Sequence, residues 1–265
     1  MLRSRITPCL LVHNRGLVKT VQFSNPKYIG DPLNAVRIFN EKEVDELVVL
    51  DIDATVHGKE PDYNMIKNLA AECRMPLCYG GGINTVEQAI KIIKLGVEKV
   101  AISSAAICNS NLVSKIGKQI GSQSVVVVLD VKKKRLSKQY EVYIDNGSKR
   151  TKRSVIDLAK EFEALGAGEI VINSIDNDGM MKGYDFELIN QVRAAVNIPI
   201  TALGGAGSLG DIGQLISKFN VIGAAAGSLF VFKGVYKAVL INYPSHNKKV
   251  ELIKRKPNET DTTIT

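Results

Sequence analysis

The sequence predicts a (β/α)8 barrel, an α/β fold also called a TIM barrel, built from two duplicated half-barrels. Three observations favour it: the length of 265 residues, an alternation of short apolar runs with amphipathic segments, and an internal repeat. Barrels of this kind typically take about 250 residues. Apolar runs that alternate with helical segments are typical of parallel strands joined by crossover helices.

Each expected strand is a short apolar run. The clearest begins at Val125, where four valines in a row and a leucine precede Asp130. Consecutive β-branched residues indicate a strand that is buried on both faces, as in a parallel sheet. We expect the eight strands at residues 5–12, 46–51, 76–80, 99–103, 125–130, 169–173, 198–203 and 221–226.

Helices are expected between these runs. Asp31 and Pro32 suit the N-cap and the first position of the first helix. Residues 16–23 predict a strand extension or hairpin, and residues 140–144 with a turn at Asn146-Gly147 predict a hairpin inserted in a charged loop. The other helices are expected at 62–73, 84–95, 111–120, 154–165, 186–196, 208–219 and after 228.

An internal repeat supports the duplicated half-barrel. Residues 47–53 match residues 170–176 at an offset of 123, and the same offset carries Gly81-Gly82 onto Gly204-Gly205. Two halves of four βα units explain this repeat. We expect the barrel to occupy residues 1–243. Residues 244–265 are polar, so we expect a poorly ordered tail.

The composition is that of a globular protein, with 45% hydrophobic and 23% charged residues. No run of about 18 uncharged apolar residues is present to cross a bilayer, and no signal-peptide core follows the first methionine. We therefore expect a cytoplasmic protein with no membrane contact. The four cysteines lack paired spacing and the three histidines lie far apart, so we predict reduced thiols, no metal and no cofactor.

Most of the net charge of +8 lies in one segment, residues 131–153, which contains nine basic residues and two acids. Beside the mouth of a barrel, such a segment would attract a small polyanion such as a phosphorylated substrate. A solvated loop and a nucleic-acid site are the alternatives. The lack of Trp, with only Tyr140 and Tyr143 in the segment, disfavours nucleic acid.

Asp130 is the first catalytic candidate, because it ends a central strand and barrels carry their chemistry at the carboxyl ends of strands. A carboxylate bonded to loop amides or lysines is the alternative. Asp176 and Asp178 follow the sixth strand on the same face, where they would hold substrate hydroxyls. Asp51 and Lys19 would orient groups near the centre. N-capping and loop hydrogen bonds are the alternative for each.

Small residues gather after four of the strands. Glycine lets backbone amides approach an anion, and a following helix adds the positive end of its dipole. The segments after the seventh and eighth strands match the usual phosphate site of barrels. The repeat predicts a second site after the third and fourth strands, which implies a substrate phosphorylated at both ends, although any one glycine run also fits a tight turn. The candidates are Gly82, Ser103, Ser104, Gly205, Gly207, Gly227 and Ser228.

A set of motifs runs along the chain: Arg5-Ile6, Val18-Lys19, Gly30-Asp31-Pro32, Asp45-Glu46-Leu47, Gly80-Gly81-Gly82-Ile83, Asp130, and residues 166–170, 174–176, 178–179, 183–185 and 204–207. By these motifs, the sequence resembles the cyclase subunit of imidazole glycerol phosphate synthase (HisF) to about residue 240. The resemblance implies a glutaminase (HisH-type) partner at the amino-terminal end of the barrel. Ammonia from this partner would pass through the barrel and convert a doubly phosphorylated ribulosyl aminoimidazole carboxamide into imidazole glycerol phosphate and an aminoimidazole carboxamide ribotide.

The resemblance also implies a charged ammonia gate and partner interface at the floor of the barrel. Its residues are Arg5, Glu46, Lys99 and Glu169, which all stand at strand starts. Charges at four strand starts are unusual, because this end of a barrel otherwise serves stability. Ordinary solvation of strand ends is the alternative.

Position 11 departs from the family pattern. The repeat sets Leu11 opposite Asp130, whereas family members that make imidazole glycerol phosphate have an aspartate there that acts with the one matched by Asp130. Losing one acid/base group typically removes about 10² to 10⁴ in rate. The resemblance therefore leaves open a weakened cyclase or a paralogue of the type found with surface-polysaccharide genes. There, such a complex is thought to feed ammonia to an enzyme that makes acetamidino sugars.

Two further interpretations stay open. A barrel like ProFAR isomerase has the same two phosphate sites and needs no ammonia; the floor charges favour the cyclase, and Leu11 counts against a paired-acid isomerase. A non-catalytic ammonia conduit is the other interpretation. Leu11 favours a conduit, whereas Asp130 and the phosphate segments argue against it.

Overall fold

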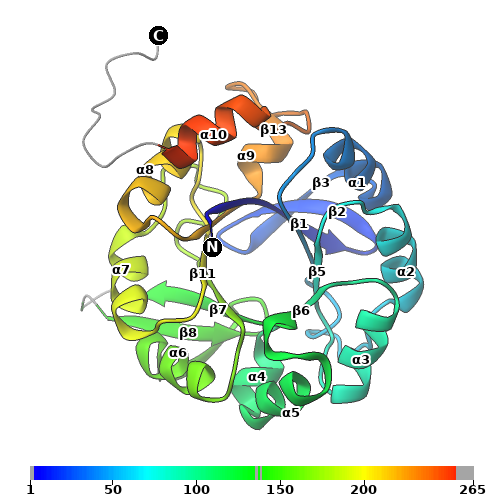
Figure 1. Cartoon of the computed structure of the whole chain (residues 1–265), viewed down its shortest axis with the longest axis vertical. Helices are drawn as coiled ribbons and strands as arrows, with labels where there is room; N and C mark the ends of the chain where they lie inside the picture. The colour runs from blue at the N-terminus through cyan, green and yellow to red at the C-terminus, as the bar shows by residue number, and fades with distance from the viewer. Residues whose placement is uncertain (1–2, 135–136, 138, 255–265) are drawn as a thin grey trace.

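The computed structural model describes residues 3–134, 137 and 139–254. Eight parallel strands form a closed barrel, which confirms the predicted fold (Figure 1). Each strand pairs with the next, and the last closes the barrel by pairing with the first, with Arg5 opposite Gly223. The strands are β1 (Arg5–His13), β4 (Leu47–Asp51), β5 (Leu77–Gly80), β6 (Lys99–Ile102), β7 (Val125–Lys133), β10 (Glu169–Ser174), β11 (Ile200–Leu203) and β12 (Gly223–Ala226).

Helices form a ring outside the barrel (Figure 1). Side-chain caps fix where several of them begin: Asp31 accepts a hydrogen bond from the amide of Asn34 at the first helix. Thr85 and Ser208 start helices at repeat-related positions, and both form capping boxes. The ring contains α1 (Pro32–Glu41), α2 (Tyr63–Glu72), α3 (Val86–Lys94), α5 (Asn111–Ile120), α6 (Val155–Ala164), α7 (Phe186–Ala195) and α8 (Leu209–Phe219).

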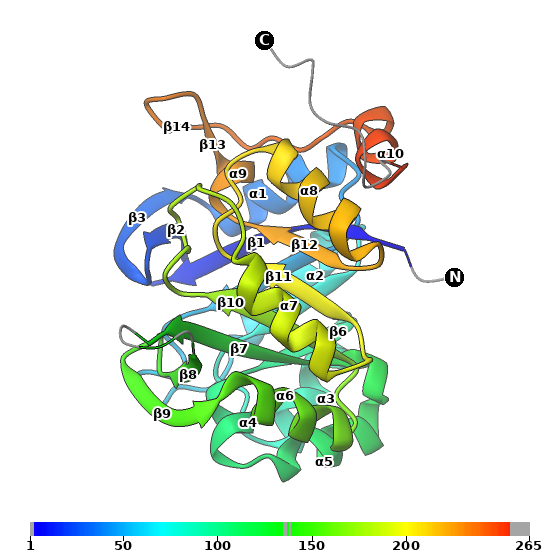
Figure 2. The same ribbon diagram turned by 90° about the vertical axis from the view of Figure 1, so that its left-hand side faces the viewer.

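The two halves carry matching additions. An antiparallel hairpin follows the first strand of each half: β2 (Gly16–Val21) with β3 (Ser24–Gly30), and β8 (Tyr140–Ile144) with β9 (Lys149–Ser154). The second hairpin was predicted, whereas the first was predicted only as a strand extension or hairpin at residues 16–23, without β3. Short helices also follow the fourth strand of each half, α4 (Ser104–Cys108) and α9 (Ser228–Val231), and a single 3-10 turn, η1 (Ser122–Ser124), precedes β7. Figure 2 shows both hairpins on the same side of the barrel, which is its carboxyl-terminal mouth.

The hydrophobic core has two parts. The larger part lies between the barrel wall and the helices, and it contains the buried rings of Phe39, Tyr79, Phe162 and Phe230. The smaller part fills the inside of the barrel with side chains of modest size, so the interior between floor and mouth is apolar. Its members are Cys9, Cys78, Ala101, Val126, Val128, Val171, Leu203 and Ala225.

The C-terminal segment differs from the prediction of a poorly ordered tail beyond residue 243. The chain forms a small hairpin, β13 (Phe232–Lys233) with β14 (Ala238–Val239), and then the helix α10 (His246–Lys254). This helix packs beside α8 and buries Leu252. The sequence is polar there because α10 buries only one narrow stripe, which composition does not reveal. Residues 255–265 lie outside the described residues.

Two findings concern the described residues as a whole. None of their helices is both long enough and apolar enough to span a membrane. Within the same residues, His, Cys, Asp and Glu side chains form no group of three or more that could hold a metal ion. All four cysteines are free thiols.

Candidate active site

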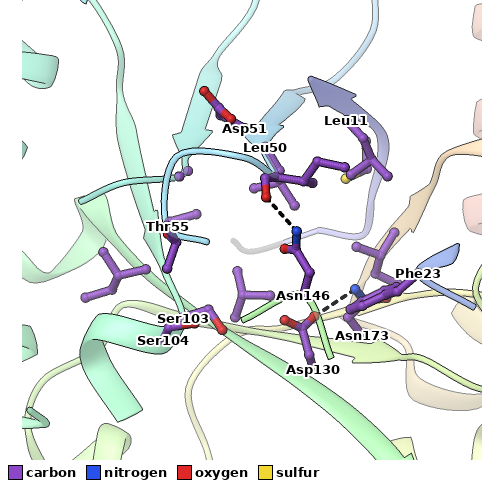
Figure 3. A pocket seen from close by; sticks show the side chains of 18 of the residues that line it. Leu11, Phe23, Leu50, Asp51, Thr55, Ser103, Ser104, Asp130, Asn146 and Asn173 are labelled. Carbon is purple, nitrogen blue, oxygen red and sulfur yellow. Dashed lines mark hydrogen bonds between the residues drawn. The ribbon is translucent and has the colours of Figure 1, made fainter. Parts of the chain in front are cut away.

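A cavity opens at the carboxyl-terminal mouth of the barrel, where this fold carries its chemistry (Figure 3). Its volume is about 1040 Å³, counted with the open space at its entrance. The lining combines apolar barrel residues with a few polar groups, which is the usual make-up of a small-molecule site. Of the predicted site residues, the lining contains Lys19, Asp51, Gly82, Ser103, Ser104, Asp130, Asp178 and Gly227.

Asp130 lies in this cavity near the end of β7. Its carboxylate accepts a hydrogen bond of 2.9 Å from the Nδ2 of Asn173. Removal from bulk water raises the pKa of Asp130 to about 6, and the nearby charge of Asp178 acts in the same direction, while Asn173 opposes them. A carboxyl group with a pKa near neutrality can both take and give a proton, which suits an acid/base catalyst.

Asn173 is a site residue that the sequence prediction missed. It lies opposite Asp130 in the pairing of β10 with β7, and it is only 6% exposed. Its Oδ1 is buried and accepts no hydrogen bond within the described chain. Ser103 lies near the same carboxylate and lowers its pKa without the full geometry of a hydrogen bond. A polar residue inside an otherwise apolar strand was the available signal for Asn173.

Leu11 lies across the cavity from Asp130, as the repeat predicted (Figure 3). It comes from β1, which stands opposite β7 in the closed barrel. Leu50 stands beside it on β4, so this wall is apolar. The cavity therefore presents one carboxylate from β7 facing a hydrocarbon surface from β1, rather than two facing acids.

Lys19 reaches the same cavity from β2. Its Nζ donates a hydrogen bond of 2.7 Å to the backbone carbonyl of Cys9, and only 7% of the residue is exposed. A Cβ at Gly227 would come within 2.0 Å of this Nζ, so the lysine needs a glycine at that position. Burial lowers the pKa of Lys19, although the charge of Asp178 opposes this. The result is a cation held close to Gly227, one of the predicted phosphate-binding residues.

Asp178 and Asp51 also line the cavity, and both have local hydrogen-bond partners. Asp178 accepts a hydrogen bond of 2.9 Å from the hydroxyl of Thr20, and burial raises the pKa of Asp178. Asp51 accepts hydrogen bonds from the amides of Asp53 and Ala54, at 2.9 and 3.1 Å. Burial raises the pKa of Asp51 against the effect of these two amides. Asp51 thus organises the loop after β4 while it faces the cavity.

The two hairpins reach across the mouth and bond to opposite halves of the barrel. At the tip of β2–β3, Gln22 donates from its amide to the carbonyl of Asp178 at 2.9 Å and from Nε2 to the carbonyl of Asp176 at 2.8 Å. At the tip of β8–β9, Asn146 donates to the carbonyl of Ile52 at 2.5 Å (Figure 3). The loops after β4 and β10 are repeat-related, so the contacts mirror each other.

The hairpin tips also contact each other and complete the roof of the cavity. A Cβ at Gly147 would lie 3.1 Å from the ring of Phe23, so the two tips pack closely. Phe23 and Asn146 both line the cavity. Ser104 accepts a hydrogen bond of 3.1 Å from the amide of Asp145, which fixes the second hairpin from the side of α4. Sequence reasoning named Lys19 on the first hairpin and the charge of the second, but it did not predict that the hairpin tips form the roof of the cavity.

Some predicted site residues lie outside the cavity lining. Asp176 accepts a hydrogen bond of 2.9 Å from the amide of Lys133, so its carboxylate stabilises the loop after β10. A Cβ at Gly205 would come within 2.1 Å of the carbonyl of Gly183, which means that loop packing requires this glycine. The residues outside the lining are Asp176, Gly205, Gly207 and Ser228.

The four predicted floor residues form one ring of ion pairs. Arg5 contacts Glu46 at 3.3 Å and Glu169 at 2.7 Å, and Lys99 contacts the same two carboxylates at 2.7 and 2.9 Å. Burial alone would raise the pKa of Glu169, but Arg5 and Lys99 outweigh it and lower that pKa. The hydroxyl of Thr201 donates a further bond of 2.5 Å to Glu169. The ring lies at the floor end of the apolar barrel interior.

The basic segment is partly neutralised by acids of the same chain. Arg150 pairs with the buried Glu141 at 2.6 Å, Lys133 pairs with Glu187 at 2.6 Å, and Arg153 pairs with Glu161. Lys149 and Lys152 on β9 are exposed. Arg135 and Lys138 lie outside the described residues. The positive charge of this segment therefore stands at the mouth, above the cavity, but is smaller than the sequence count suggests.

Comparisons with known proteins agree with this geometry. Residues 5–237 match the family described as "Histidine biosynthesis protein", and the chain belongs to this family. It is 59% identical over 252 residues to "Putative imidazole glycerol phosphate synthase subunit HisF" from Leptospira borgpetersenii, covering 95% of this chain and 99% of that one.

Two other relatives are similar over nearly their whole length. A chain from Vibrio vulnificus, whose name differs only in ending in hisF3, is 55% identical over 254 residues, covering 96% of this chain and 98% of the relative. "Imidazole glycerol phosphate synthase subunit HisF" from Clostridium botulinum is 40% identical over 243 residues, covering 92% and 96%.

Proposed function

We propose that this chain is the cyclase subunit of a HisF-type imidazole glycerol phosphate synthase. It would use ammonia from a partner glutaminase to convert the doubly phosphorylated ribulosyl aminoimidazole carboxamide to imidazole glycerol phosphate and the carboxamide ribotide. The observation that carries the proposal is Asp130, a buried carboxyl group with a pKa of about 6 that faces the cavity at the mouth of the barrel. The names of the relatives support the same activity.

The chemistry at the mouth follows from the lining. Ammonia is a neutral nucleophile that loses a proton after it attacks carbon, so the reaction needs a base at that point and an acid for the leaving group. Asp130 supplies both functions, held in place by Asn173. Lys19, Ser103, Ser104, Gly82 and Gly227 would bind the substrate and its phosphates, with Asp51 and Asp178 on its hydroxyls. Four further predicted residues lie outside the cavity lining and would support the loops that bind the substrate. They are Gly205, Gly207, Ser228 and Asp176.

The floor supports a glutaminase partner in a heterodimer. The ring of Arg5, Glu46, Lys99 and Glu169 would act as the ammonia gate, because it lies at the floor end of the apolar barrel interior through which ammonia would pass. Ammonia is small and uncharged, so an apolar interior lets it pass while it hinders ions. We expect this complex to act in the cytoplasm.

A second candidate function rests on Leu11. This residue replaces the facing acid with hydrocarbon, which fits a paralogue or ammonia conduit that supplies nitrogen to another acceptor, such as an acetamidino sugar of O-antigen biosynthesis. The numbered name of the Vibrio vulnificus relative fits a paralogue as well. An isomerase without ammonia chemistry is less well supported, because such a barrel has no need for a charged gate.

The test is a single-turnover conversion of the ribulosyl substrate with ammonium chloride, comparing wild type with Leu11→Asp. The cyclase proposal predicts product from wild type and a faster reaction for the variant. Product from the variant alone would favour the paralogue with another acceptor. No product from either protein, with both folded, would contradict the cyclase proposal.

A further inference from the structure

The C-terminal helix contacts the floor of the barrel next to the gate. Lys249 on α10 is only 9% exposed, and its Nζ donates to a carboxylate oxygen of Asp45 at 2.9 Å and to the carbonyl of Glu43 at 3.0 Å. Asp45 immediately precedes Glu46 of the ring. A buried lysine is rare unless it is paired, so this contact is a built feature and not a chance surface ion pair.

Tyr243 makes a second contact at the same place. Its hydroxyl donates to the carbonyl of Ile6 at 2.7 Å and accepts from the amide of Asp45 at 3.2 Å. The ammonium group of Lys249 lies 5.2 Å from the centre of the Tyr243 ring. The centre of the Phe230 ring lies 5.3 Å from the centre of the same ring. Tyr243 thus links the C-terminal segment to the residues just beside Arg5 and Glu46.

These side chains replace missing backbone bonds between two barrel strands. The ladder between β1 and β4 begins only at Cys9 and Val48, so Ile6 lies before it. The amide of Ile6 donates instead to Asp45 Oδ2 at 3.0 Å, and its carbonyl accepts from Tyr243. The starts of β1 and β4 are therefore joined by side chains, one of which is itself held by Lys249.

We infer that Tyr243 and Lys249 are positioning residues of the gate: through Ile6 and Asp45, they hold Arg5 and Glu46 at the distance that closes the ring. The inference rests on the proposed function, which makes this ring an ammonia gate. It gives α10 a part in that function, although the helix lies outside the barrel and far along the chain from Arg5 (Figure 2). We call these contacts of Tyr243 and Lys249 with Ile6 and Asp45 the clamp. Loss of the clamp would change the distances within the ring at the floor and leave the cavity at the mouth unchanged.

The test is a double-mutant cycle in urea unfolding, with Lys249→Met, Glu46→Gln and the double variant. If Lys249 acts on the ring, the loss in unfolding midpoint of the double variant is smaller than the sum of the single losses, because the first change has already disturbed the ring. Lys248→Met is the matched control, since Lys248 lies on the same helix and pairs with Glu251 at 2.9 Å. Its effect adds to that of Glu46→Gln.

The inference would be overturned if the effect of Lys249→Met on the unfolding midpoint simply added to that of Glu46→Gln, as the effect of Lys248→Met is expected to do. Tyr243→Phe, which removes one hydroxyl, keeps the cycle informative if Lys249→Met does not fold. A second readout is proton exchange of the Lys99 ammonium group by NMR, which we expect to accelerate in Lys249→Met and not in Lys248→Met. Neither readout uses turnover, so they judge the clamp even if the proposed synthase activity fails.

Discussion

The two ends of the barrel use charged side chains in opposite ways. At the floor, Arg5 and Lys99 each contact both Glu46 and Glu169, which lowers the pKa of Glu169 and raises that of Lys99. Glu169 and Lys99 are thus each shifted toward their charged form.

Inside the cavity at the mouth, three titratable side chains have neutral hydrogen-bond partners. Asp130 binds the amide of Asn173, Asp178 binds a hydroxyl, and Lys19 binds a backbone carbonyl. Burial raises the pKa values of Asp130 and Asp178 and lowers that of Lys19, so each group is shifted toward its uncharged form. Groups left in that condition can exchange protons with a substrate or bind its charges, whereas mutually paired groups cannot.

The largest effect that we expect from a single substitution is the loss of turnover on replacing Asp130. Asp130→Asn keeps the size of the side chain but cannot accept a proton, so we expect ammonium-dependent turnover to fall by about 10² to 10⁴. Single-turnover assays measure this loss. Asp157→Asn on the exposed face of α6 is the control and should retain full activity. Equal rates for wild type and Asp130→Asn would remove Asp130 from the mechanism.

The floor should respond in stability. Glu169→Gln leaves Arg5 and Lys99 with one carboxylate between them, and breaking a buried ion pair costs about 3 kcal/mol or more. Glu72→Gln at the exposed pair with Arg37 should cost less than about 1 kcal/mol. Urea unfolding of both variants measures the difference. Equal losses would mean that the ring is an ordinary surface cluster.

The pH dependence of the floor has a definite sign. Because the pKa of Glu169 is lowered on folding, its contribution to stability is present above the usual carboxyl range and is lost as pH falls through the lowered value. Asp130 has the opposite sign, because its raised pKa makes stability fall as pH rises from about 4 to about 6. We therefore measure the free energy of unfolding against pH for both variants. Glu169→Gln should remove a loss of stability that wild type shows as pH falls, and Asp130→Asn should remove a loss that wild type shows as pH rises.

Asn173 sharpens the comparison at the mouth. Asn173→Leu removes the donor to the charged form of Asp130, so the pKa of Asp130 should rise above its value of about 6. Carbon-13 NMR of the labelled carboxyl group follows this titration directly. Asn173→Asp would raise it further, because it adds a like charge. An unchanged midpoint in both variants would show that the hydrogen bond does not tune Asp130.

The smallest expected effect concerns the exposed lysines of β9. Lys149→Ala with Lys152→Ala removes two unburied charges above the mouth, so kcat/KM for the phosphorylated substrate should fall a few-fold at low salt. The difference from wild type should shrink at physiological ionic strength, where the Debye length is about 8 Å. An effect that is independent of salt would argue for direct contact with substrate instead of steering.

Local pattern was sufficient to predict the barrel and to place several candidate residues at its mouth. The valines before Asp130 and the cap at Asp31 are local signals, and the repeat placed Leu11 opposite Asp130. Lys249 had no such signal, because its partner Asp45 lies 204 positions away and the surrounding sequence is polar. Burial of that lysine depends on tertiary contact alone, so composition predicted a tail where the chain forms α10.

The most direct test of the whole account follows nitrogen from floor to mouth. The chain, in complex with the proposed glutaminase partner, is given glutamine labelled with nitrogen-15 in the amide, together with excess unlabelled ammonium, and the label in the product is measured by mass spectrometry. The account predicts product that carries mainly nitrogen-15, because ammonia enters through the ring and stays in the barrel interior. Product labelled only in proportion to the bulk ammonium would contradict it.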